Sequence, residues 1–236
     1  SNKIRPKEIN EYINGQLEIQ DLGSQLASRL VAPKKYDCII DLCCGSGGKT
    51  LAIGSLMKNT GIIYAIDISI KKLKNLESRL KRSGLTNVWP IHINNLNDEK
   101  LLNLKNKADC ILLDVPCSGF GTLRRNPDLK WRISPCKLEM YVKKQNEILR
   151  AASQLSKKAG YIVYVTCSIL REENEEVIDC FLREFTEFEI CDSKKILSNQ
   201  GVQLSKINVT FNVNKSLSLY TDLTNTDSFF MVKLKK

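Results

Sequence analysis

The sequence has little of what a metal site needs. It contains one histidine, His92, and none of its nine cysteines is spaced as C-x-x-C. A structural zinc site would therefore have to recruit four dispersed thiolates. We expect no bound metal and a structural role for His92.

Long apolar runs are also missing. No segment approaches the ~20 apolar residues that a membrane-spanning helix requires. The first ten residues, SNKIRPKEIN, lack the apolar segment of a secretory signal peptide. We expect a cytoplasmic protein with no membrane partner, in a reducing compartment where the thiols are free.

Two common phosphate-binding motifs are incomplete. The apolar run 38–43 is followed by the glycine-rich stretch CGSGGKT, residues 44–50, and then by a helical pattern. A P-loop would need glycine at Cys43, and the dinucleotide fingerprint would need glycine at Thr50. A strand, a glycine-rich turn and a helix N-terminus still form a typical cofactor-binding arrangement.

The charge balance favours a polyanionic partner. Thirty-six Lys and Arg against 26 Asp and Glu give a net charge of +10. The alternative is a lysine-rich composition whose side chains are simply solvated. Basic residues cluster between Arg124 and Lys144, where acids are few, and this clustering favours nucleic acid.

The order of apolar and amphipathic segments predicts a parallel-rich α/β sheet. Residues 1–32 are expected to form an N-terminal helical extension that packs on the core, and residues 33–236 one domain. Residues 193–226 are expected to be irregular. Helices are expected at about 50–58, 69–83, 135–156 and 172–184. Strands are expected at 38–43, 61–67, 88–93, 108–114, 160–166, 186–191 and 227–234.

Polar and reactive side chains follow the expected strands. Ligands in such sheets bind beyond the carboxyl ends of the strands. If strands 108–114 and 160–166 are neighbours, their ends lie only ~5 Å apart. Cys117 and Cys167 could then face one pocket. The residues at strand ends are Asp41, Asp67, Asn95, Asp114, Cys117 and Cys167.

These residues favour covalent chemistry on a nucleobase. A thiolate that adds to carbon 6 of cytosine makes carbon 5 nucleophilic, and an acid at ring nitrogen 3 stabilises the adduct. Arg124, Arg125 and Lys130 would neutralise phosphates, and Trp131 or Phe120 would stack on bases.

Each residue type also has a simpler explanation. A lone cysteine is more often inert core than nucleophile, an acid such as Asp114 can merely cap a turn, and the arginines can be surface charge. The tripeptides Pro-Cys-Ser and Thr-Cys-Ser, each at the end of an expected strand, favour the chemical roles.

Over residues 12–236 the chain resembles the Nop/Sun-type RNA cytosine-5 methyltransferases. Its motif sequences are most similar to those of the bacterial small-subunit (16S) rRNA members. The motifs are QDLGSQ (20–25), DLCCGSGGKT (41–50), DVPCSGFGTLRRNPDLKW (114–131), YVTCSILREENEE (164–176) and DSFFMVKL (227–234). The resemblance implies a Rossmann-like class I S-adenosylmethionine-dependent methyltransferase, with a seven-stranded, mostly parallel sheet and helices on both faces.

The resemblance also implies roles for individual residues. Cys167 is the expected nucleophile, Cys117 helps to release the product, and Asp114 faces both cytosine and cofactor. The third-strand acid of the family is replaced by Asn95 or by its neighbour Asn94, and either keeps an acceptor but loses charge. The expected cofactor-binding residues are Cys43, Cys44, Gly45, Ser46, Gly47, Gly48, Lys49, Asp67, Asn95 and Asp114.

The expected function is methyl transfer from S-adenosylmethionine to carbon 5 of a cytosine in RNA, 16S rRNA first, through a covalent cysteine–cytosine adduct. The same chemistry on tRNA and a non-catalytic RNA-binding assembly factor are the alternatives. Small-subunit members usually have an additional N-terminal RNA-binding domain that this chain lacks. We therefore expect a catalytic-domain fragment or a shortened protein.

Overall fold

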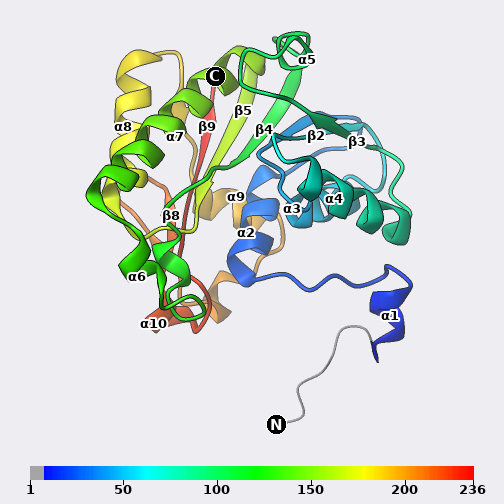
Figure 1. The fold of residues 1–236 in the computed structure, drawn as a ribbon, viewed down its shortest axis with the longest axis horizontal. Coiled ribbons are helices and arrows are strands. Elements are labelled where there is room, and N and C mark those ends of the chain that lie inside the picture. The colour runs from blue at the N-terminus through cyan, green and yellow to red at the C-terminus, as the bar shows by residue number, and fades with distance from the viewer. Residues whose placement is uncertain (1–7) are drawn as a thin grey trace.

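In the computed structural model, which describes residues 8–236, nine strands form one sheet of order β3-β2-β1-β4-β5-β9-β8-β7, and β6 pairs with β9 (Figure 1). Strands β1 to β5 run parallel, whereas β9 runs antiparallel to β5. The strands are β1 (Cys38–Leu42), β2 (Ile62–Asp67), β3 (Val88–His92), β4 (Ala108–Asp114), β5 (Ser156–Thr166), β6 (Glu189–Ile190), β7 (Thr210–Phe211), β8 (Leu217–Leu219) and β9 (Phe229–Lys235).

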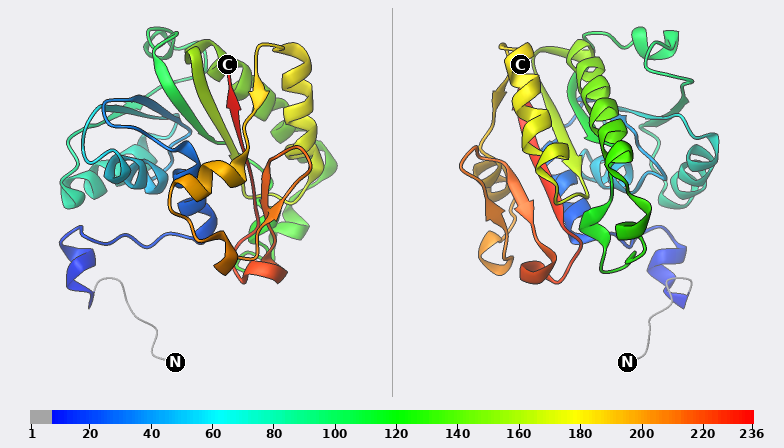
Figure 2. Two further views of the ribbon diagram at one scale, coloured as in Figure 1. Left: turned by 180° about the vertical axis from the view of Figure 1, so that it is seen from behind. Right: turned by 60° about the vertical axis from the view of Figure 1, so that its left-hand side comes forward.

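Helices cover both faces of this sheet (Figure 2). The longest, α7, begins with the N-cap Ser134, whose side chain accepts a hydrogen bond from the Lys137 amide, and with Pro135 in its first turn. The α-helices are α1 (Asn10–Ile13), α2 (Leu22–Val31), α3 (Gly48–Leu56), α4 (Ile70–Ser83), α5 (Glu99–Leu102), α6 (Leu129–Arg132), α7 (Pro135–Leu155), α8 (Glu175–Glu184), α9 (Ser193–Asn199) and α10 (Thr221–Thr224).

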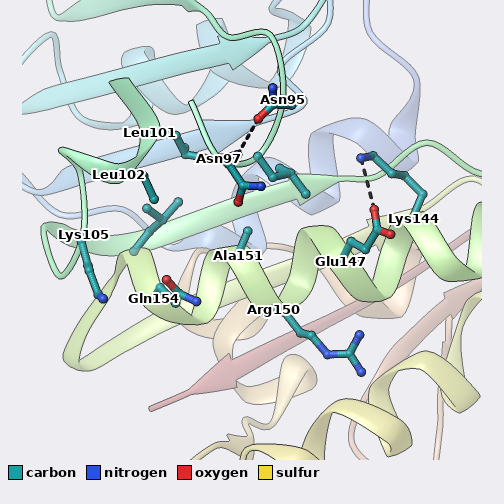
Figure 3. Close-up of a pocket in the computed structure, with 12 residues that line it drawn as sticks. Asn95, Asn97, Leu101, Leu102, Lys105, Lys144, Glu147, Arg150, Ala151 and Gln154 are labelled. Atoms are coloured by element: carbon teal, nitrogen blue, oxygen red, sulfur yellow. Dashed lines mark hydrogen bonds and ion pairs between the residues drawn. The ribbon is translucent and has the colours of Figure 1, made fainter. Parts of the chain in front are cut away.

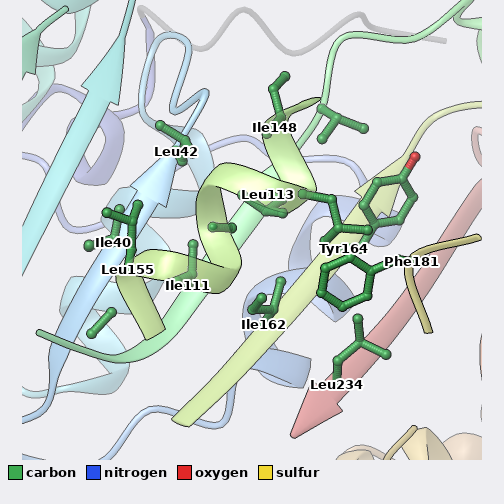
Figure 4. Close-up of a cluster of buried hydrophobic side chains, with 14 of the residues drawn as sticks. Ile40, Leu42, Ile111, Leu113, Ile148, Leu155, Ile162, Tyr164, Phe181 and Leu234 are labelled. Carbon is green, nitrogen blue, oxygen red and sulfur yellow. The ribbon is translucent and has the colours of Figure 1, made fainter. Parts of the chain in front are cut away.

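The central strands are apolar on both faces because each face is covered. Successive side chains of a strand point to opposite sides. Ile40, Ile111 and Ile162 therefore pack in one cluster with α5, α7 and α8 (Figure 4). Their neighbours Ile39 and Cys110 pack on the other face with α2, α3, α4 and α9. Burying one such isoleucine contributes ~1.5–3 kcal/mol.

A glycine-rich turn joins β1 to α3. Gly47 has a φ of 81°, and a Cβ on it would lie 2.2 Å from the Leu76 side chain of α4. Only glycine meets both conditions. The turn therefore packs closely on α4, and α3 begins directly beside the ends of β1 and β4.

The expected α/β fold is confirmed, with two more strands than the seven expected. Segment 193–226, expected to be irregular, contains the short strands β7 and β8 as well as two helices. Helix α8 begins at Glu175 rather than Glu172, because a 3-10 turn (Arg171–Glu173) precedes it.

The N-terminal region differs in part from the expectation. Helix α2 packs on the sheet through Leu26 and Leu30, but residues 14–21 are not helical. Residues 1–7 of the expected extension lie outside the described residues. Its separation from a catalytic domain stays a prediction.

Candidate active site

Two Cys-Ser turns meet where β4 and β5 end. The strands are parallel neighbours, and Asp114 pairs with Val165 across them. The chain then turns through Cys117 after β4 and Cys167 after β5. Their Sγ atoms lie 3.3 Å apart. The structure thus brings the two predicted thiols into direct contact.

The pKa values of the two thiols are shifted in opposite directions. A hydrogen bond from the Cys117 thiol, with Lys49 nearby, lowers the pKa of Cys167 in spite of burial. The same hydrogen bond, burial and the negative charges of Cys167 and Glu173 raise the pKa of Cys117. Because the thiolate is the nucleophilic form of cysteine, these pKa shifts favour Cys167 over Cys117 as the nucleophile. The roles of the two cysteines stay a prediction.

Asp114 forms an ion pair with Lys49. The Lys49 Nζ lies 2.6 Å from the Asp114 Oδ2, and Lys49 is largely buried whereas Asp114 is partly exposed. The ammonium also lies 5.7 Å from the centre of the Phe229 ring. The ammonium group of Lys49 thus contacts the predicted catalytic acid, and the predicted role of Lys49 in cofactor binding stays a prediction.

A cavity of about 300 Å³ opens at the carboxyl ends of β1, β2, β3 and β4. Of the predicted cofactor residues, Cys43, Gly45, Asp67, Asn95 and Asp114 line it. The others do not line the cavity: Cys44, Ser46 and Gly47 are in the glycine-rich turn, and Gly48 and Lys49 begin α3. The sequence does not predict the apolar wall, formed by Leu42, Ile66, Ile68, Ile93, Leu96, Pro116 and Ile148.

Asp67 anchors the glycine-rich turn. Its Oδ2 accepts a hydrogen bond from the Gly45 amide at 2.9 Å, and its Oδ1 accepts one from the Ser69 amide at 2.8 Å. Each oxygen retains a further lone pair. Asp67 therefore shapes the cavity and still presents acceptor capacity to a ligand.

A second cavity, of about 640 Å³, lies on the far side of Pro116 between the Cys117 turn and α6 and α7. Cys117 and Tyr141 line it. Three cations, Arg132, Lys137 and Lys144, are in its wall, which has no acid. The predicted RNA residues Arg124, Lys130 and Trp131 are exposed, and in the chain they lie between residues that line this cavity. Trp131 is 82% exposed.

Arg125 makes a different contact. Its guanidinium forms a two-point ion pair with Asp227, which is buried just before β9. This pair ties the stretch after β4 to the last strand. The predicted role of Arg125 in RNA binding stays a prediction.

A third cavity, of about 460 Å³, lies between α5 and α7 (Figure 3). Asn95 and Lys144 border both it and the cofactor cavity. Lys144 contacts Glu147 at 3.4 Å, as Figure 3 shows. Neither thiol nor Asp114 lines this cavity, so it lies beside the reactive groups rather than around them.

A network of buried polar residues lies next to the two thiols. The sequence does not predict these residues as part of the site. The Glu173 carboxylate accepts hydrogen bonds from Ser118 and from Gln145 of α7. Ser118 also contacts Ser168 at 3.2 Å. The repeated Cys-Ser pair and the acidic run 172–176 are the sequence signals for this network.

Residues 8–236 show no metal-binding cluster and no membrane-spanning helix. They contain no group of three or more His, Cys, Asp or Glu side chains arranged to hold a metal ion. In the same residues, no helix is both long and apolar enough to span a membrane.

The strand order and the cavity at the strand ends define the class I methyltransferase fold. Over residues 28–235 the chain matches the family described as 16S rRNA methyltransferase RsmB/F, and it belongs to that family.

Three similar proteins illustrate the relationship. The chain is 38% identical over 180 residues to the probable ribosomal RNA small subunit methyltransferase B of Bacillus subtilis, with 75% of this chain and 40% of that protein covered. It is 33% identical to the tRNA (cytosine(72)-C(5))-methyltransferase of Pyrococcus horikoshii, with 97% and 54% covered. The crystal structure of NSun6 from Pyrococcus horikoshii with SFG superposes with a TM-score of 0.83 at 31% identity, covering 98% of this chain and 56% of that one.

Proposed function

We propose that this chain is the catalytic part of an RNA cytosine-5 methyltransferase that uses S-adenosylmethionine and a covalent cysteine–cytosine adduct. The observation that supports this most directly is the 3.3 Å contact between a thiol of lowered pKa and one of raised pKa. One thiol is suited to attack a base, and the other to hold a proton beside it.

The cavity at the strand ends fits the proposed cofactor. Its apolar wall suits an adenine ring, Asp67 and Asn95 offer acceptors for ribose hydroxyls, and Asp114 offers a carboxylate to a cationic group. When bound, S-adenosylmethionine would supply an electrophilic methyl group.

The side chains divide the remaining work. The Cys167 thiolate adds to carbon 6 of cytosine, and the electron pair of the 5,6 double bond becomes available at carbon 5. A proton passes through Asp114, which Lys49 holds in place, to ring nitrogen 3, where it neutralises the negative charge of the adduct. After methylation, water accepts the carbon 5 proton and Asp114 takes back the nitrogen 3 proton. The 5,6 double bond forms again as the bond between carbon 6 and the Cys167 sulfur breaks. Cys167 leaves as a thiolate, and the Cys117 thiol assists by donating a hydrogen bond to it.

The second cavity supports RNA as the substrate. It begins at Cys117, and three cations with no acid in its wall suit a phosphate backbone. Similarity to an rRNA enzyme and to a tRNA enzyme leaves both substrates as candidates. We place 16S rRNA first because the family that matches residues 28–235 bears that name.

Incubation with radiolabelled S-adenosylmethionine and separated rRNA and tRNA pools tests the proposal. We expect label in 5-methylcytosine of one pool, and none with Cys167→Ala. Label in rRNA supports the first substrate, and label in tRNA alone replaces it with the second. No label in either pool, with RNA binding intact, would favour a non-catalytic RNA-binding factor.

A further inference from the structure

Glu173 is a buried acid beneath the two thiols. It has 0% exposed surface and lies in the 3-10 turn between β5 and α8. Within residues 8–236 no ion pair involves it. Burying a carboxylate without a cation is costly. A carboxylate at this position therefore requires a specific set of hydrogen bonds, and the structure provides one.

In the hydrogen bonds of the described residues, the Glu173 carboxylate acts only as an acceptor. The Ser118 amide donates to Oε1 at 2.8 Å, the Ser118 hydroxyl to Oε2 at 2.5 Å, and the Gln145 amide group to Oε1 at 3.0 Å. An ionised carboxylate accepts hydrogen bonds and donates none. The site is thus built for a negative charge.

These bonds join the two turns that present the cysteines. Ser118 directly follows Cys117, and Ser168 directly follows Cys167. Their hydroxyls lie 3.2 Å apart, with Ser118 also bound to Glu173. Gln145 donates a second hydrogen bond, to the Pro116 carbonyl, at 3.0 Å. The network therefore binds the residue before Cys117 and the residue after it.

The same 3-10 turn holds the Cys167 side. The Tyr164 hydroxyl of β5 donates to the Glu173 carbonyl at 2.6 Å. Asn174, the next residue, donates to the Ser168 carbonyl at 3.0 Å and accepts from Thr166 at 2.5 Å. A shift of this turn would therefore move both thiols relative to each other.

We propose that Glu173 is a positioning residue that locks the two Cys-Ser turns together and so holds the sulfur atoms of Cys117 and Cys167 at hydrogen-bonding distance. This inference rests on the function proposed above, which assigns the two thiols different roles. Glu173 lines neither the cavity at the strand ends nor the cavity beside Cys117, and it acts through Ser118 and Cys117.

The charge of Glu173 adds an electrostatic effect. The hydrogen bond with Cys167, burial, the charge of Cys167 and that of Glu173 all raise the pKa of Cys117. A neutral amide would remove the last of these contributions. The charged and titratable groups that act on the two thiols are Lys49, Asp114, Arg125, Tyr164 and Glu173.

Alkylation of the free protein by iodoacetamide tests the inference. The rates at Cys117 and Cys167 are followed by peptide mass spectrometry between pH 6 and 9, and the exposed Cys136 serves as internal reference. The wild type should react faster at Cys167 than at Cys117. In Glu173→Gln that preference should fall by roughly tenfold, the effect of one pKa unit. Glu172→Gln, next to it but exposed, should leave it unchanged.

An unchanged preference and pH profile in folded Glu173→Gln would overturn the inference. If that variant does not fold, Ser118→Ala decides, because it removes the hydroxyl that reaches Glu173 and Ser168 but keeps the backbone amide bond. It should show a smaller fall in the same direction, and no change would overturn the inference. The assay contains neither RNA nor cofactor. If the wild type methylates no RNA but Glu173→Gln still loses the alkylation preference, the proposed function is refuted and this inference stands.

Discussion

The ammonium of Lys49 lies 2.6 Å from the carboxylate of Asp114, across the junction of two strand–helix units. Lys49 is in the first turn of α3, and Asp114 ends β4. The pair connects the glycine-rich turn to the acid expected to face the base. Lys49 lowers the pKa of Cys167 and Asp114 raises it, so the ion pair also moderates the charge around the nucleophile.

Lys49→Gln should weaken the nucleophile. Asp114 then faces Cys167 without a counter-ion, so the Cys167 pKa rises and less thiolate is present at neutral pH. We expect Cys167 alkylation at pH 7 to slow by roughly tenfold for each pKa unit. Lys71→Gln, on the exposed side of α4, is the matched control. Equal rates in both variants would contradict this role of Lys49.

Cys117→Ala should trap a covalent complex. With its release partner missing, Cys167 still adds to the base, but the methylated adduct breaks down slowly. A denaturing gel should show a slow-migrating RNA–protein band that is lost in the double variant with Cys167→Ala. Cys136→Ala, a change of an exposed cysteine at the start of α7, should give no band. Absence of a band in a folded Cys117→Ala protein would refute this division of roles.

Trp131 and Arg124 should contribute to RNA binding in different ways. Both are exposed. Trp131→Ala removes a stacking surface worth ~1–3 kcal/mol per base, with little change in salt dependence. Arg124→Ala should lower the slope of log K against log salt by about 0.7, the value for one phosphate contact on a single strand. Fluorescence anisotropy over a salt series measures both effects. Lys195→Ala on α9 is the control, and a slope change in it equal to that of Arg124→Ala would exclude a local contact.

Asp41 should make the protein less stable as pH rises. Burial raises its pKa to about 7, although Thr50 donates a hydrogen bond to it at 2.5 Å. Between about pH 4 and pH 7 the unfolded state has lost a proton that the folded state keeps, so folding weakens across this window.

Asp41→Asn removes the titration, so the variant should exceed the wild type in free energy of unfolding at pH 8 by on the order of 4 kcal/mol, with the gain shrinking toward pH 4. Urea unfolding at the two pH values measures this. A gain that does not depend on pH would argue against the buried charge, and Asp179→Asn, at an exposed position, should show neither effect.

Local sequence patterns predict the sheet and the meeting of the thiols well. Parallel strands covered on both faces are continuous apolar runs, so β1, β4 and β5 stand out, and the residues after them must lie at one edge. The short strands β7 and β8 leave no such signal, because they have two and three residues in a polar segment.

Contacts made by long-range folding are not predictable in the same way. Lys49 belongs to a glycine-rich motif and so is predicted to bind cofactor, but its partner Asp114 is 65 residues away in the chain. Arg125 is basic and lies in a cationic stretch, yet it pairs with Asp227, 102 residues away. Glu173 lies in an acidic run, and its burial depends on contacts with Ser118 and Gln145, which are 55 and 28 residues away in the chain.

Lys144 borders all three cavities beside the active site. The Lys144 side chain therefore lines both the proposed cofactor cavity and the proposed RNA cavity. A ligand that binds the Lys144 ammonium group in one cavity makes it unavailable to a ligand in the other. Affinities for the two ligands should then be linked, and by thermodynamic reciprocity each must alter the other by the same factor.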